Sequence, residues 1–105
     1  MNTKYVVLDN KLLPAKVADL LLEEALGNDY KSVMTVFSSN EQTWEIYLEI
    51  LLQEAKKNNI NHNYDLKFIS EMISKMVKNN SPDNTEITVK IFQGKKDILY
   101  AYFSP

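Results

Sequence analysis

The clearest hydrophobic pattern of the chain lies between Asn40 and Lys57, NEQTWEIYLEILLQEAKK. Its apolar residues recur at steps of three and four, which places them on one side of an α-helix. These residues are Trp44, Tyr47, Leu48, Leu51, Leu52 and Ala55. Ser39 or Asn40 would cap the start of the helix, and Ile46 and Ile50 form a second apolar edge. The pattern predicts a long helix with neighbours on two sides.

The first thirty residues predict a strand followed by a helix. Residues 4–9, KYVVLD, are rich in β-branched and aromatic side chains, as strands are. Pro14 suits the first position of a helix, where the missing N–H has no intrahelical partner to lose. Gly27 suits the end, because glycine adopts the left-handed conformation of a helix C-cap. The stripe that we expect this helix to bury consists of Val17, Leu20 and Leu21.

Residues 30–38, YKSVMTVFS, fit two kinds of secondary structure. Tyr30, Val33, Met34 and Phe37 follow the spacing i, i+3, i+4, i+7 of a helix face. The run VMTVF, however, is composed of residues that prefer strands. We favour a short helix and keep the strand as the alternative, because the periodicity alone does not decide between them.

The second half of the chain predicts a helix and then a β-hairpin. The helix, at residues 64–78, would bury an apolar stripe. This stripe consists of Leu66, Ile69, Met72 or Ile73, and Met76. Residues 79–84 combine asparagines with Pro82 and predict a loop. Apolar and polar residues alternate over 86–91, and in the apolar run 98–103 the isoleucine and tyrosines alternate with Leu99, Ala101 and Phe103. Gly94 supplies a turn residue between them, so residues 85–103 predict a β-hairpin.

Together these elements predict a single α+β domain over residues 1–105. Three or four helices would pack on a small antiparallel sheet formed by the C-terminal β-hairpin and the N-terminal strand. A chain of 105 residues buries enough surface for one core. The sequence has neither an apolar run of about 18 residues nor the pattern of a signal peptide, so we expect a cytoplasmic location.

Composition and charge change this picture in three ways. The chain has no cysteine, which excludes disulfides and thiolate chemistry, and all twelve of its basic residues are lysines. Residues 1–54 hold four lysines and nine acidic residues, a net charge of −5, whereas residues 55–105 hold eight lysines and five acidic residues, a net charge of +3. This asymmetry favours oriented contact with a partner or with a second copy. The many lysines, asparagines and isoleucines are typical of an AT-rich genome, such as that of a bacterium or a phage.

Sequence patterns of catalysis, cofactor binding and metal binding are missing. His62 lies in an asparagine-rich segment without a nucleophile or an orienting acid nearby in the sequence. Gly27 and Gly94 are the two glycines, and their spacing forms no phosphate-binding loop. Acidic pairs four residues apart lack the histidines of a dinuclear metal site. We therefore expect no enzymatic activity, no cofactor and no metal.

DNA binding is the alternative function. If residues 30–38 form a strand, the element order becomes helix, strand, helix, helix, hairpin, which is the order of a winged-helix domain. This is an analogy of order and carries no motif. The contacting lysines would be Lys67, Lys75 and Lys78 on the recognition helix and Lys90, Lys95 and Lys96 on the wing. The missing arginine and the pI near 5.3 weigh against this function.

Contact with another protein is the function that we expect first. An inhibitor, an immunity protein, an adaptor or a regulator would each work in this way. The candidate contact residues are the acidic series Glu41, Glu45 and Glu49, with Phe92 or Phe103 on the outer face of the hairpin. Homodimerisation through the hairpin edge or the long helix is a further expectation.

Overall fold

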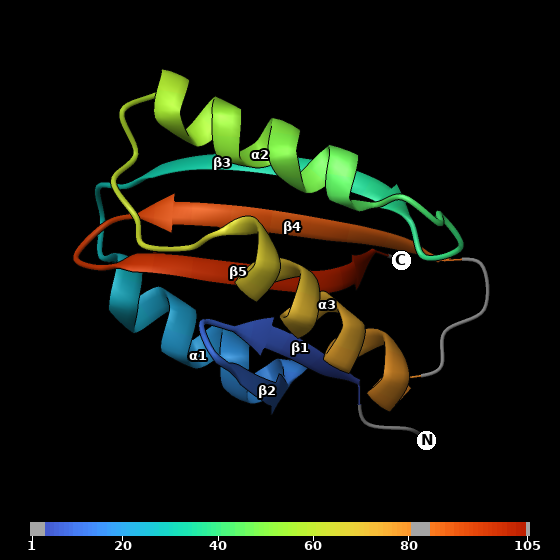
Figure 1. The fold of residues 1–105 in the computed structure, drawn as a ribbon. Helices are drawn as coiled ribbons and strands as arrows, with labels where there is room; N and C mark the ends of the chain where they lie inside the picture. Colours follow the sequence, from blue (N-terminus) through green and yellow to red (C-terminus); the bar gives the residue numbers. More distant parts are fainter. Residues whose placement is uncertain (1–3, 81–84, 105) are drawn as a thin grey trace.

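The computed structural model describes residues 4–80 and 85–104, which form three helices and five strands (Figure 1). In chain order these elements are β1 (Tyr5–Leu8), β2 (Lys11–Pro14), α1 (Ala15–Leu26), β3 (Lys31–Ser38), α2 (Glu45–Lys57), α3 (Leu66–Asn80), β4 (Glu86–Gln93) and β5 (Asp97–Ser104). The predicted α+β class is confirmed. The predicted loop at 79–84 lies mostly outside the described residues, although α3 includes its first two positions.

The five strands form one antiparallel sheet in the order β2-β1-β5-β4-β3. The predicted C-terminal hairpin and the N-terminal strand are both in this sheet, and Val7 of β1 pairs with Ala101 of β5. The hairpin is its centre, because β3 pairs with the free side of β4 and β1 pairs with that of β5. Both outer sides of the hairpin are therefore paired within the chain, and homodimerisation stays a prediction.

One face of the sheet, which we call the helix-pair face, is covered by α2 and α3. The strands contribute inward-facing apolar side chains at alternate positions, among them Ile87, Val89 and Ile91 of β4. The helices contribute fully buried side chains from the stripes that the sequence predicted. These are Leu48, Leu51 and Ala55 of α2 and Ile69, Ile73 and Met76 of α3. This face holds the larger of two cores.

The opposite face, which we call the half-covered face, is packed against α1. Here α1 contacts β1 and β2, and Figure 1 shows α1 and α3 on opposite sides of the sheet. Ala18 and Leu26 of α1 are buried in a second core. The strand residues of this core are Val6, Leu8, Phe92 and Ile98. The domain is therefore a sheet between two layers of helices of unequal extent.

The structure corrects the predicted start and the predicted buried stripe of the first helix. Lys11–Pro14 forms β2, which pairs with β1 across a turn at Asp9, and Pro14 is the N-cap of α1. The side chains of Val17, Leu20 and Leu21 are 44%, 69% and 43% exposed. The small Ala18 and Ala25 face the sheet instead and let the helix approach it closely. The predicted end at Gly27 is confirmed, with φ of 73°.

Residues 30–38 are the second correction, because they form strand β3 and not a short helix. All eight residues of β3 pair with β4, from Lys31 opposite Gln93 to Ser38 opposite Glu86. This pairing satisfies the backbone hydrogen-bonding groups of the central strand β4 on its second side. Phe37 packs in the main core, and Met34 on the other face is 57% exposed.

The long helix is the third correction, because α2 begins at Glu45 and not at Asn40. The backbone N–H of Ser39 donates to the carbonyl of Thr85 at 2.8 Å, and its hydroxyl accepts from the N–H of Thr85 at 3.3 Å. Ser39 therefore joins the end of β3 to the start of β4 and is not the helix cap. Trp44 occupies the N-cap position without a side-chain capping bond.

Candidate functional site

The outward side of α2 combines exposed apolar and acidic side chains. Ile46 is 57% exposed and Ile50 is 47% exposed, although the sequence predicted a second packing neighbour for them. Glu45 and Glu49 are also exposed. At 3.6 residues per turn, the two isoleucines and the two glutamates form adjacent stripes along the same helix. We call these four residues the α2 surface.

The α2 surface is held in place by the packing of the opposite side of the helix. Phe37 of β3 contacts Trp44 with ring centroids 5.9 Å apart and stacks on Tyr47 at 5.6 Å. Leu48 and Leu51 are fully buried below the helix. Because these anchors fix the rotation of α2, the isoleucines and glutamates point away from the sheet as a set.

Glu41 is separate from the rest of the predicted acidic series. It lies in the turn that follows β3, where its backbone N–H donates to the carbonyl of Ser38 at 3.0 Å. Its side chain is exposed, as are those of Glu45 and Glu49. The series of three along one helix is thus reduced to two residues on α2 and a third before it.

The exposure that we predicted for Phe92 or Phe103 is wrong, because both side chains are buried. Phe92 is 6% exposed and packs below α1, with the Tyr30 ring against it at 5.5 Å. Phe103 is 9% exposed and faces α2 and α3. A hairpin at the centre of a sheet that has helices on both faces leaves neither phenylalanine available to a partner.

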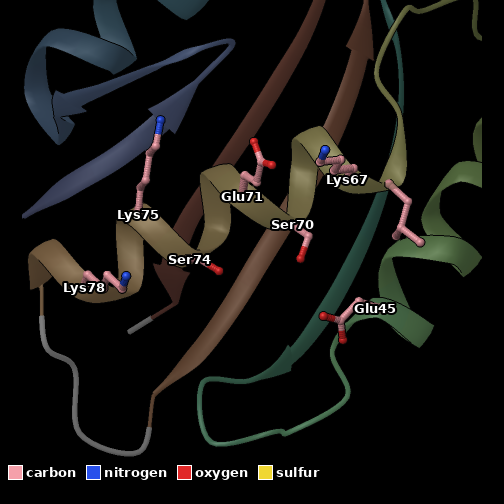
Figure 2. Close-up of a pocket in the computed structure, with 8 residues that line it drawn as sticks. Glu45, Lys67, Ser70, Glu71, Ser74, Lys75 and Lys78 are labelled. Carbon is pink, nitrogen blue, oxygen red and sulfur yellow. The ribbon is translucent and has the colours of Figure 1, made fainter.

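Three of the predicted DNA-contacting lysines line a shallow groove beside α3 (Figure 2). The groove has a volume of about 610 Å³. Its lining residues are Glu45, Leu66, Lys67, Ser70, Glu71, Ser74, Lys75 and Lys78. Figure 2 shows Lys75 extending away from Ser70 and Ser74. The lysine side chains therefore do not converge on one point, and two glutamates share the groove with them.

The other three predicted lysines lie elsewhere. Lys90 is on the half-covered face, with its Nζ 5.6 Å from the centre of the Tyr102 ring and 5.9 Å from that of Phe92. Lys95 and Lys96 are in the turn between β4 and β5. Because residues 30–38 form a strand, the order of elements is the one expected of a winged helix. Their arrangement in space is different, since the sheet separates α1 from α2 and α3 and the hairpin is at the centre of the sheet.

His62 belongs to a cluster that the sequence did not reveal. Its Nδ1 accepts a hydrogen bond from the Tyr64 N–H at 3.0 Å, and the two rings stack at 5.6 Å. The Tyr64 hydroxyl donates to Asp9 Oδ1 at 2.5 Å and to the Asp97 carbonyl at 3.1 Å. Burial, and then the Asp9 carboxylate, raise the pKa of Tyr64 far above its ordinary value. These contacts join three segments of the chain and hold the tyrosine protonated.

A second tyrosine–carboxylate pair lies on the half-covered face. The Tyr100 hydroxyl donates to Asp19 Oδ1 of α1 at 3.2 Å. Burial, followed by the charge of Asp19, raises the pKa of Tyr100 to about 12. Neither tyrosine is therefore an available proton acceptor near neutral pH. Within residues 4–80 and 85–104, no group of three His, Cys, Asp or Glu side chains is arranged to hold a metal ion.

Comparison with protein-family models and with curated proteins found no match for this chain. In the described part of the chain, none of the helices has the length and apolar character needed to cross a membrane.

Proposed function

We propose that this protein is a small non-catalytic module that acts by binding another protein through the α2 surface. The observation that carries the proposal is the pair Ile46 and Ile50, 57% and 47% exposed on a helix whose opposite side is firmly packed. Large apolar side chains at a rigid, exposed position lose little conformational freedom on binding and desolvate favourably.

The charge around the isoleucines indicates the chemistry of the partner. Glu45 and Glu49 border them on α2, and Glu41 lies just before the helix. A partner with a small apolar pocket and lysines or arginines at its rim would complement this arrangement. In this proposal the isoleucines supply affinity, and the glutamates speed association and select against acidic proteins.

The proposal is tested by capture followed by reconstitution. The immobilised protein is used to isolate binding proteins from an extract of its source, and each protein identified by mass spectrometry is then purified. Its affinity is measured by calorimetry against wild type and Ile50→Ser. We expect Ile50→Ser to weaken binding about tenfold or more, as loss of a central apolar contact does.

Charge variants give the second measurement. Glu45→Lys with Glu49→Lys should slow association and reverse its dependence on salt, because attraction to a basic partner becomes repulsion, which salt screens. Glu86→Lys, on the exposed start of β4, is the control and should leave association within a factor of about two. If every purified binding protein tolerates both the isoleucine and the glutamate variants, the α2 surface is not the site.

DNA binding is the second candidate, supported by the three lysines that share the α3 groove. The test is fluorescence anisotropy with a labelled generic duplex at low salt, where phosphate contacts dominate affinity. Binding that weakens when Lys67, Lys75 and Lys78 are replaced by glutamine would support this candidate. No binding at low salt would eliminate it.

A further inference from the structure

The side of α1 that faces away from its own sheet is apolar. Leu20, the most exposed of the large hydrophobic residues that the structure describes, is 69% exposed, and Val17 and Leu21 beside it are 44% and 43% exposed. Leu20 lies about 160° around the helix from Leu22, which packs toward the sheet. We call Val17, Leu20 and Leu21 the α1 stripe. A helix with apolar residues on both sides is typical of one that is buried between two layers.

The half-covered face has a second area, with exposed Met34 and Tyr30, that lies outside the core below α1. Except for Phe92, the side chains that β3 and β4 present on this face are absent from that core, and Thr88 among them is buried. We call this area the open half, and its residues are Ser32, Met34, Val36, Thr88 and Lys90, with Tyr102 of β5 and Tyr30 before β3. Met34 is 57% exposed and Tyr30 is 52% exposed. The α1 stripe and the open half are on the same side of the sheet.

We propose that two copies of this chain associate through these two areas, with the α1 stripe of each copy packed on the open half of the other. In this dimer the half-covered faces of the two copies face each other and are related by a 180° rotation about an axis parallel to the strands. The rotation places the α1 stripe of each copy opposite the open half of the other. Both contacts therefore form together, as an isologous dimer requires. The two α1 helices then lie side by side in one layer between two sheets.

The dimensions of the elements fit this arrangement. Five strands at about 4.8 Å spacing span about 19 Å between the outer strands, which is room for two helices packed 8–10 Å apart. The helix-pair face already carries two helices, α2 and α3, over the same five strands. α1 has 12 residues and is about 18 Å long, whereas the eight residues of β3 extend about 27 Å. Each open half can thus hold the whole of the partner's helix.

The surfaces also match in charge. α1 carries Asp19, Glu23 and Glu24 against one lysine, Lys16. The open half presents Lys90, whose Nζ lies over the rings of Phe92 and Tyr102. The acidic helix of the partner supplies a counter-charge to this lysine. Because the contact is mainly apolar and this charge pair lies at its edge, added salt should change the affinity of the dimer only slightly.

Sedimentation of the purified protein between about 1 µM and about 1 mM tests the proposal. Wild type should form a dimer in this range. Leu20→Lys and Met34→Glu, each at an exposed position, should raise the dissociation constant about tenfold or more. An equimolar mixture of the two variants should associate more tightly than either alone, because one of its two contacts is wild type and the other pairs opposite charges. Ile50→Lys on α2 should leave the dimer unchanged.

Cross-linking gives a readout that does not depend on the stability of the variants. The chain has no cysteine, so Leu20→Cys and Met34→Cys introduce single thiols. Under oxidised glutathione, a mixture of these variants should form a mixed disulfide dimer faster than either variant forms its own. A wild type that stays monomeric to about 1 mM overturns the proposal. A dimer that is weakened by Ile50→Lys and not by Leu20→Lys also overturns it. So does a mixture of Leu20→Lys and Met34→Glu that associates no more tightly than either variant alone. The result is independent of partner binding at the α2 surface.

Discussion

The hydroxyl of Tyr64 donates a hydrogen bond to the carboxylate of Asp9, with 2.5 Å between the oxygens. Asp9 is held at φ of 57° in the turn between β1 and β2, and its Oδ1 also accepts the N–H of Leu99 at 3.2 Å. Tyr64 precedes α3 and donates as well to the Asp97 carbonyl at the start of β5. One side chain thus joins the N-terminal hairpin, the last strand and the start of a helix.

Replacing Tyr64 by phenylalanine should destabilise the domain by about 1–3 kcal/mol. The ring would remain, but a partly buried carboxylate would lose a hydrogen-bond donor. The free energy of unfolding in urea measures the effect. Tyr30→Phe, which keeps the ring contact with Phe92, is the control and should change stability by less than about 0.5 kcal/mol. Equal stability of the two variants would mean that the Tyr64–Asp9 bond is not made in solution.

The Tyr100–Asp19 pair predicts a pH dependence at the alkaline end. The pKa of Tyr100 is raised from 10.0 to about 12, so the folded state holds this proton more tightly than the unfolded chain. The resulting stability is fully present below about pH 10 and is lost as the pH rises through about 12. The difference in phenolate absorbance between wild type and Tyr100→Phe gives the pKa. Asp19→Asn should lower it, because both the carboxylate charge and the charge-assisted bond are removed.

Gly94 in the turn between β4 and β5 should not tolerate alanine. A Cβ at this position would lie 2.5 Å from the carbonyl oxygen of Leu26 and 3.0 Å from its Cα, so backbone would have to move. We expect a loss of roughly 1–3 kcal/mol in thermal or urea unfolding. Lys96→Ala, at an exposed position of the same turn, is the control and should change stability by less than about 0.5 kcal/mol. A Gly94→Ala protein as stable as wild type would contradict the close approach of the turn to α1.

Truncation of two adjacent residues of α2 should change the stability of the domain by very different amounts. Leu51 is fully buried and Ile50 is 47% exposed. Leu51→Ala should cost about 2–5 kcal/mol through lost contacts and a cavity, whereas Ile50→Ala should stay within about 0.5 kcal/mol. Urea unfolding of both variants at one protein concentration makes the comparison. A large loss for Ile50→Ala would show that α2 is covered in solution.

The parts of the fold that local sequence predicts are those in which local and long-range preferences agree. The hairpin has an alternating pattern in β4, a run of strand-forming residues in β5 and a turn glycine between them, and α3 buries the predicted Ile69 and Met76. The residues of β3 fit both a helix pattern, which we favoured, and a strand pattern. The choice between them is made by β4, whose pairing residues lie about fifty to sixty positions further along the chain. No local rule contains that information.

Helix α1 was predicted with the correct period but the wrong orientation. Leu20 and Leu21 are more hydrophobic than Ala18 and Ala25, yet the alanines face the sheet. Hydropathy ranks side chains by their free energy of transfer from water. The close packing of a helix on a sheet depends also on side-chain size, and it favours small residues such as alanine. The candidate surfaces could not be read from sequence for the same reason. Ile46 and Leu51 differ in burial and hardly in hydrophobicity.

The pairing of β1 with β5 has a consequence for how the protein is made. Val7 and Leu8, near the start of the chain, find their strand partners at Ala101 and Tyr100, almost at its end. Until β5 has been synthesised, β1 has no strand to pair with on its second side. Completion of the sheet therefore waits for the last strand in chain order. Until then Leu22 and Leu26 of α1 lack Ile98, the residue of β5 in the core that they share.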